Sequence, residues 1–226
     1  MAFSDERVVR EVKSLFVAGT DTTGHSLSWA FYFIATRPDL LARCRKEALE
    51  VAPETNGLVT TPRQSSRLVF CCAVFMESLR LRPAGTRLVV HNVEDYTMKN
   101  GFEAPKGTAF FLLTRYMALS EETFTRAREF IPERWIEAER EDALLGKKVG
   151  DEERTVRHRK EAFLAFGSGP RSCPGQEMVK TEATILLAAV CARFNISLAP
   201  GQPNPPQEVA GFTSRPEMVD LVLTRA

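Results

Sequence analysis

The first part of the chain carries apolar residues at the spacing of an α-helix. A stripe of positions three or four residues apart runs from Ser4 and resumes over residues 27–34. Pro38 restricts the backbone of Arg37, so we expect this helix to end there. A second helix is predicted over residues 39–50, with its charges on one face. The chain therefore opens with two consecutive helices.

Two further helices are predicted from apolar runs. Residues 67–81 form one, which Pro83 ends, and residues 178–194 form another that is apolar almost throughout. A loop is predicted over residues 53–62, which lie between prolines. Both helices are too apolar to lie in solvent, so we expect each of them to pack in a core.

Short segments of β-forming residues lie between the helices. Residues 87–91, 96–98 and 109–112 are separated by turn-forming sequences, and this pattern is typical of hairpins. A further hairpin is predicted around Gly211, and the chain closes with an apolar segment over residues 218–223. The fold class that follows is mainly α with small β-hairpins.

Three segments are predicted to lack regular structure. Residues 129–135 contain a proline and read as irregular, and residues 163–175 form a loop rich in glycine and proline. Residues 137–159 are highly charged, so we expect a solvated surface insertion with a short helix at its start.

Composition and charge narrow the class of protein. The chain has 226 residues, of which 44% are hydrophobic and 26% charged, as in an ordinary globular domain. Lys and Arg number 30 against 29 Asp and Glu, so nothing indicates a nucleic-acid or anionic membrane partner. The longest apolar run, residues 185–192, is far shorter than the ~20 residues that a bilayer span needs. Residues 1–10 show no signal-peptide core.

The cysteines do not form a disulfide or zinc pattern. There are five, an odd number without C-x-x-C spacing, which favours a reducing compartment. Cys71 and Cys72 lie in an apolar run and are interpreted as core residues, although a thiol-redox protein that uses this pair is an alternative. The three histidines, His25, His91 and His158, share no metal-ligand spacing, and His25 is expected to have a surface or packing role.

The loop over residues 166–175 carries the strongest chemical signal. Its glycines let the backbone approach a flat ligand closely, and Arg171 offers a forked cation for a carboxylate. Cys173 comes just before an apolar helix, whose free N–H groups and dipole stabilise a thiolate, the form that binds iron. The alternative is a buried free cysteine beside a glycine turn.

Three weaker segments break local rules. Residues 18–24 place poor helix formers in the middle of the first helix, which should loosen or kink there, and a carboxylate beside a hydroxyl can deliver protons. Glu77 and Arg80 lie three positions apart and can pair. Residues 132–135 form a charged and aromatic cluster. Each of these signals is unspecific by itself.

Taken together, the four segments resemble the cytochrome P450 family and follow its order along the chain. The family's haem-binding signature, F-x-x-G-x-R-x-C-x-G, is matched at Phe166, Gly169, Arg171, Cys173 and Gly175. The stretch Ala18-Gly19-x-Asp21-Thr22-Thr23 resembles its oxygen-activation motif. The remaining two segments, Glu77-x-x-Arg80 and Pro132-Glu133-Arg134-Trp135, resemble its conserved pair of charges and the arginine segment that completes their network.

The resemblance implies the fold and the site. Residues 1–226 would be the C-terminal part of a single cytochrome P450 domain, without the family's N-terminal half, and should therefore expose an apolar face. Cys173 would be the thiolate ligand of the haem iron, and Asp21 and Thr22 would deliver protons to oxygen. The other positions expected near the haem are Arg171, Phe166, Gly169, Gly175 and Gly19, with Arg87 or His91 at a propionate.

The resemblance also implies the reaction. A haem-thiolate monooxygenase inserts one atom of O2 into an apolar substrate, with electrons that come from NAD(P)H through a reductase or a ferredoxin-type donor. Substrate contacts are expected from residues 16–19, 84–90 and 211–213. A full-length eukaryotic form would lie in the endoplasmic reticulum or mitochondrial membrane, attached through the N-terminal part. The alternatives are a family member that rearranges an oxygenated lipid, which the Asp21-Thr22 pair disfavours, and a non-catalytic truncated remnant.

Overall fold

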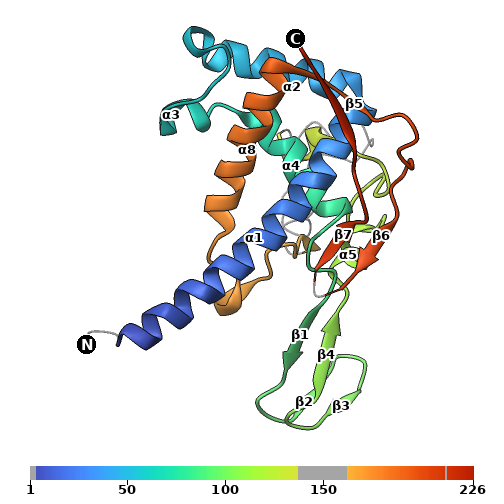
Figure 1. The fold of residues 1–226 in the computed structure, drawn as a ribbon. Coiled ribbons are helices and arrows are strands. Elements are labelled where there is room, and N and C mark those ends of the chain that lie inside the picture. Colours follow the sequence, from blue (N-terminus) through green and yellow to red (C-terminus); the bar gives the residue numbers. More distant parts are fainter. Residues whose placement is uncertain (1–3, 137–161, 212) are drawn as a thin grey trace.

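The computed structural model describes residues 4–136, 162–211 and 213–226. Within these ranges the chain is mainly helical with small two-stranded antiparallel sheets, as the pattern predicts (Figure 1). The four long helices are α1 (Asp5–Thr36), α2 (Pro38–Val51), α4 (Val69–Leu81) and α8 (Gln176–Arg193). Their predicted positions are confirmed to within a few residues. The predicted insertion over residues 137–159 lies outside the described residues.

The prediction that α1 loosens over residues 18–24 is wrong. The helix is continuous through this segment, from Asp5 to Thr36. The hydroxyls of Thr20 and Thr22 donate to the carbonyls of Phe16 and Ala18, at 2.7 and 2.6 Å. Each hydroxyl therefore bonds to the helix's own preceding turn, and the helix accommodates its poor helix formers without a break.

Several short helical turns were not predicted. They are α3 (Pro62–Ser65), α5 (Thr114–Ala118) and the 3₁₀ turns Pro53–Thr55, Pro132–Trp135 and Gly169–Arg171. The sequence does contain a helix-start signal for α3, because Thr61 and Gln64 form a reciprocal capping box there. The loop predicted over residues 53–62 is thus partly helical at both ends.

The strands of the described residues form four antiparallel pairs. They are β1 (Leu88–His91) with β4 (Ala109–Leu112), β2 (Tyr96–Thr97) with β3 (Glu103–Ala104), β5 (Phe194–Leu198) with β8 (Leu221–Arg225), and β6 (Glu208–Ala210) with β7 (Ser214–Pro216). The hairpin predicted around Gly211 is confirmed as β6–β7. The apolar tail pairs with β5, a strand directly after α8 that the helical pattern concealed.

The core lies where α2, α4 and α8 meet, and it contains three cysteines. Cys44, Cys71 and Cys191 come one from each helix, and all three are fully buried. By contrast, the first half of α1 extends away from the other helices (Figure 1), and it exposes apolar side chains such as Val12 (58%) and Phe16 (71%). The expected apolar face is therefore present.

A buried charge network joins α4 to the segment after α5. Both oxygens of Glu77 accept hydrogen bonds from Arg80, at 2.8 and 2.9 Å, and Glu77 also accepts from Arg134 (3.2 Å) and from the indole of Trp135 (3.0 Å). The Glu77 and Arg80 side chains have no exposed surface. We call Glu77, Arg80, Arg134 and Trp135 the charge network. The resemblance predicted its three charges, and the structure adds the tryptophan.

Arg80 also binds three carbonyl groups of the chain. Its guanidinium donates to Ala118 O (2.7 Å), Ala127 O (2.6 Å) and Glu129 O (2.9 Å). With the two bonds to Glu77 this satisfies all five of its N–H donors. A lysine has three donors and no planar fork, so it cannot replace this arginine.

Arg80→Lys is therefore expected to lower the free energy of unfolding by roughly 3–5 kcal/mol, as loss of a buried partner does. Urea denaturation monitored by circular dichroism measures the change. The matched control is Arg37→Lys, because Arg37 makes a similar forked pair with Asp39 on the surface. The control should cost less than about 1 kcal/mol. Equal stability of the two variants would contradict this account of the network.

Candidate functional site

The Cys173 loop, residues 163–175, is held in shape by its own backbone. Cys173 N–H donates to Phe166 O at 2.8 Å, which closes the loop across its width. Gly167 and Gly169 have φ of +69° and +66°, which side chains other than glycine rarely adopt. A Cβ on Gly167 would lie only 3.8 Å from Arg171 O, so the two sides of the loop come close together there.

The thiol of Cys173 is exposed, which contradicts the alternative of a buried free cysteine. Helix α8 begins three residues later, at Gln176, and its N-cap Gly175 provides no side-chain cap. Gln176 N–H donates to Cys173 O at 3.4 Å, and the helix dipole of α8 favours negative charge close to the loop. A Cβ on Gly175 would lie 3.9 Å from the Cys173 sulfur, so the glycine keeps the surroundings of the thiol open.

The other four cysteines have different surroundings. Cys44, Cys71 and Cys191 are buried, and Cys72 is half-buried. Burial raises the pKa of the Cys72 thiol. The neighbouring Cys44 thiol, together with burial, raises the pKa of Cys191. Raised pKa values keep thiols protonated and unreactive, so the structure disfavours a redox role for Cys71 and Cys72.

The surroundings of Cys173 suit a metal whose other ligands belong to the cofactor that carries it. The described residues contain no group of three or more His, Cys, Asp or Glu side chains that can hold a metal ion. Gly169 has open space where a side chain would project, and Arg171 beside it is exposed. One accessible thiol, an open glycine surface and an exposed cation together suit a flat, anionic metal cofactor such as haem.

Asp21 and Thr22 lie on α1, away from direct contact with the Cys173 loop. Asp21 is exposed and Thr22 half-buried, and no hydrogen bond or ion pair of the described residues joins either side chain to the loop. Their helix packs against α8, which follows Cys173 in the chain. Gly19, one turn earlier on α1, also has open space beside it. The helix that carries Asp21 and Thr22 thus contacts the helix that begins just after the Cys173 loop.

Of the two candidate propionate ligands, Arg87 is the one whose neighbour in the chain comes close to the Cys173 loop. The side chain of Leu88, its neighbour in the chain, comes within 4.0 Å of a Cβ built on Gly167. His91 ends β1, three residues farther along a strand that rises about 3.3 Å per residue. Both side chains are exposed. Proximity therefore favours Arg87.

Sequence reasoning missed an aromatic link between the charge network and the Cys173 loop. Trp135, which donates to Glu77, packs edge-on against Phe163 with ring centroids 4.8 Å apart. Phe163 in turn contacts Phe166, at 6.3 Å, and Phe166 O accepts the hydrogen bond from Cys173. The sequence shows only that these residues are aromatic. It does not show that they meet, since α4, the Trp135 turn and the Cys173 loop are separate segments.

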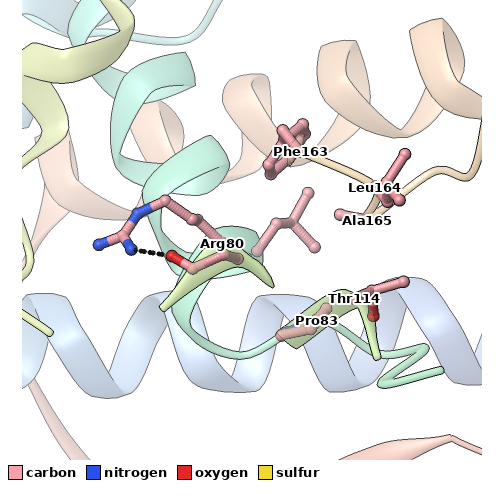
Figure 2. Close-up of a pocket in the computed structure, with 8 residues that line it drawn as sticks. Arg80, Pro83, Thr114, Phe163, Leu164 and Ala165 are labelled. Carbon is pink, nitrogen blue, oxygen red and sulfur yellow. Dashed lines mark hydrogen bonds between the residues drawn. The ribbon is translucent and has the colours of Figure 1, made fainter. Parts of the chain in front are cut away.

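A small pocket lies behind the loop and supports it. Figure 2 shows Phe163, Leu164 and Ala165 on one side of this pocket, with Arg80, Pro83 and Thr114 on the other. The dashed line there is the bond from Arg80 to Ala118 O. The pocket has no room for a water molecule. It is part of the packing that holds the start of the loop against α4 and is no binding site.

Comparisons with known proteins agree with this geometry. The family model described as Cytochrome P450 matches residues 1–222. Rat mitochondrial sterol 26-hydroxylase is 29% identical over 88% of the chain, and rat cytochrome P450 2D4 is 30% identical over 90% of it. The haem domain of a cytochrome P450DA mutant superposes with a TM-score of 0.83 over 99% of the chain, at 24% identity.

The chain spans 35–37% of the length of these two rat relatives and 45% of the cytochrome P450DA chain. No helix in the part of the chain that the structure describes is long and apolar enough to cross a membrane.

Thiol labelling should separate the cysteines by exposure. In the native chain without a bound cofactor, Ellman's reagent is expected to react rapidly with one thiol, that of Cys173, more slowly with Cys72, and with the remaining three only after unfolding. Stopped-flow absorbance measures the phases. Cys173→Ser should abolish the rapid phase and Cys72→Ser should preserve it. A rapid phase that survives Cys173→Ser would show that another thiol is accessible.

Proposed function

The chain belongs to the cytochrome P450 family, and we propose that it binds haem through Cys173 and serves in a monooxygenase that inserts one atom of O2 into an apolar substrate. The observation that carries the proposal is the exposed Cys173 thiol, in a glycine-shaped loop immediately before α8. No other thiol of the chain is exposed, and all five lie in the described residues.

A bound haem supplies the iron whose thiolate ligation favours O–O cleavage. The chain's own residues hold and orient it. Cys173 Sγ binds the metal, and the Arg171 and Arg87 guanidiniums bind carboxylates by charge-assisted hydrogen bonds. Phe166, whose carbonyl accepts the hydrogen bond from Cys173 N–H, would tune the surroundings of the sulfur. Gly169, Gly175 and Gly19 leave room for the flat group.

Asp21 and Thr22 deliver protons in this proposal. The Asp21 carboxylate is exposed, so it can exchange protons with water. Thr22 Oγ1 uses its own hydrogen to donate to Ala18 O at 2.6 Å. Its lone pairs can therefore accept a hydrogen bond from a proton donor on the other side. The overall reaction consumes two electrons and two protons per O2, and one oxygen atom leaves as water. The electrons come from NAD(P)H through a reductase or a ferredoxin-type donor.

The substrate is proposed to be hydrophobic. Phe16 and Val17, just before the Asp21 motif, expose 71% and 60% of their surface, and Val89 and Val90 of β1 are also exposed. Phe212, within the predicted substrate-contact segment 211–213, lies outside the described residues. We place the full-length protein at the mitochondrial or endoplasmic reticulum membrane, and one relative's name includes the mitochondrion.

Difference spectra of the reduced chain with and without carbon monoxide test the haem ligand. The chain expressed with haem should show the red-shifted Soret band of a thiolate-ligated ferrous carbonyl, and Cys173→Ser should lose it. Cys72→Ser is the matched control and should keep the band. If the unaltered chain takes up no haem, its membership of the family stands, but the proposal that these residues bind haem is wrong and the non-catalytic alternative is supported.

Proton delivery is tested by Asp21→Asn and Thr22→Ala. Both variants should keep the thiolate-type carbonyl spectrum while product formed per NAD(P)H consumed falls, with a turnover loss of about 10²-fold, as for loss of a proton-transfer group. The assay uses the haem-loaded chain with its electron donor. Thr20→Ala is the control, because Thr20 makes the same backbone bond on an exposed face. Unchanged product yield in Thr22→Ala would contradict the role.

A further inference from the structure

Helix α2 holds the start of α4 with a carboxylate. Both Glu47 oxygens accept hydrogen bonds from the first turn of α4, from Phe70 N–H at 2.6 Å and from Cys71 N–H at 2.8 Å. The N-cap of α4, Leu68, provides no side-chain cap, and the first turn of α4 contains no acidic residue. Glu47 therefore supplies, from another helix, the cap and the negative charge that stabilise the start of a helix.

The same helix holds the end of α8 with a guanidinium. Arg45 Nε donates to Cys191 O at 2.8 Å, and Arg45 Nη2 donates to Phe194 O at 2.7 Å and to Asn195 Oδ1 at 2.9 Å. The last carbonyls of a helix have no partner within it, and a cation beside them is favourable. Arg45 and Glu47 are both half-buried and lie two positions apart on α2. We call the hydrogen bonds of these two side chains the α2 bonds.

The ends of α4 and α8 that α2 holds lie far from Cys173. Helix α8 has 18 residues between the Cys173 loop and its held end, which at 1.5 Å per residue is about 27 Å. Helix α4 begins at its held end and carries Glu77 and Arg80 of the charge network near its other end. The three helices pack against one another, and Figure 1 shows α2 across the end of α8 that is opposite the Cys173 loop. Thus α4 and α8 run in opposite directions between α2 and the proposed site.

The Cys173 loop is attached to both of these helices. Its first part is held to α4, because Phe163 packs on Trp135 and Trp135 donates to Glu77. Its last part continues directly into α8 at Gln176. The loop therefore bridges the two helices, and any change in the position of one helix relative to the other must be taken up within the loop that contains Cys173.

We propose that Glu47 and Arg45 are positioning residues, which fix α4 against α8 and thereby set the position of Cys173 at the far end of both helices. The inference rests on the proposed function, in which Cys173 binds the haem iron. A ligand atom must be placed to within a fraction of an ångström. Without the α2 bonds, the helices shift against each other, the loop takes up the shift, and the bond from Cys173 to iron weakens. Neither side chain touches the cofactor; both act through the helices.

Hydrogen exchange followed by mass spectrometry tests the α2 bonds without any haem readout. Glu47→Ala should speed amide exchange in residues 69–72, and Arg45→Ala should speed it in residues 191–196. Each increase should be about ten- to a hundredfold, the range that hydrogen bonds to a charged group give. The matched control is Glu50→Ala, because Glu50 lies on the same helix in an exposed pair with Lys46, at 3.8 Å. The control should leave both segments unchanged.

The carbonyl spectrum of the reduced, haem-loaded chain tests the role in positioning. Glu47→Ala and Arg45→Ala should each lower the ratio of the red-shifted thiolate band to the unshifted band by about three- to tenfold, with haem content unchanged. The double variant should lower the ratio little further, because loss of either set of α2 bonds already frees one helix from the other. Glu47→Gln keeps one acceptor oxygen for the start of α4 and should restore most of the ratio.

A core variant separates positioning from stability alone. Ile34 lies on α1 and is fully buried, so Ile34→Val removes one methylene group from the core without touching α2. This variant should unfold at a lower urea concentration than the unaltered chain, yet keep its ratio of thiolate to unshifted band in the absence of urea.

The outcomes distinguish this inference from the proposed function. Faster exchange with a lowered band ratio supports both the α2 bonds and their role. Unchanged exchange in both alanine variants overturns the α2 bonds as supports of the helix ends. Faster exchange with an unchanged ratio, or an equal loss of the ratio in Ile34→Val, overturns the role in positioning. If the unaltered chain binds no haem, the proposed function fails and the positioning role fails with it, while exchange still reports on the α2 bonds.

Discussion

The buried carboxylate of Glu77 is the constraint on which the rest of the structure depends. It has no exposed surface, and its partners come from α4, from the backbone N–H of Ile131 at 2.9 Å and from the 3₁₀ turn at Pro132–Trp135. A buried charge is costly unless every partner is in place, so these segments must assemble together. The network therefore adds little net stability but allows few arrangements of the segments that meet there.

This arrangement extends to the chemistry through the aromatic link. Trp135 is oriented by its bond to Glu77, Phe163 packs on Trp135, and Phe166 follows in the same cluster. The backbone of Phe166 then accepts the bond that fixes Cys173. A ligand residue, which we propose Cys173 to be, must be held to within a fraction of an ångström by its supporting contacts. Here those contacts begin in a charge network on another part of the chain.

Four of the five cysteines show two different uses of one residue type. Three lie at the junction of α2, α4 and α8, where they behave as small apolar residues. Cys173 is exposed at the start of α8, where a thiolate has the helix N-terminus near it. A similar division applies to the charged pairs: Arg37 and Asp39 are on the surface, whereas Glu77 and Arg80 organise the interior.

The sequence by itself determined the long helices, the hairpin positions and the Cys173 loop, because apolar periodicity, proline and glycine act locally. It did not determine that α1 passes unbroken through residues 18–24, where the hydroxyls of Thr20 and Thr22 bond to carbonyls of the same helix instead of ending it. Strand β5 stayed hidden because it follows directly on the apolar pattern of α8, and its partner β8 comes only after the β6–β7 hairpin. The burial of Glu77, the position of Trp135 and the bond of His25 to Thr213 were decided only by tertiary structure, because each depends on residues that the chain brings together from distant segments.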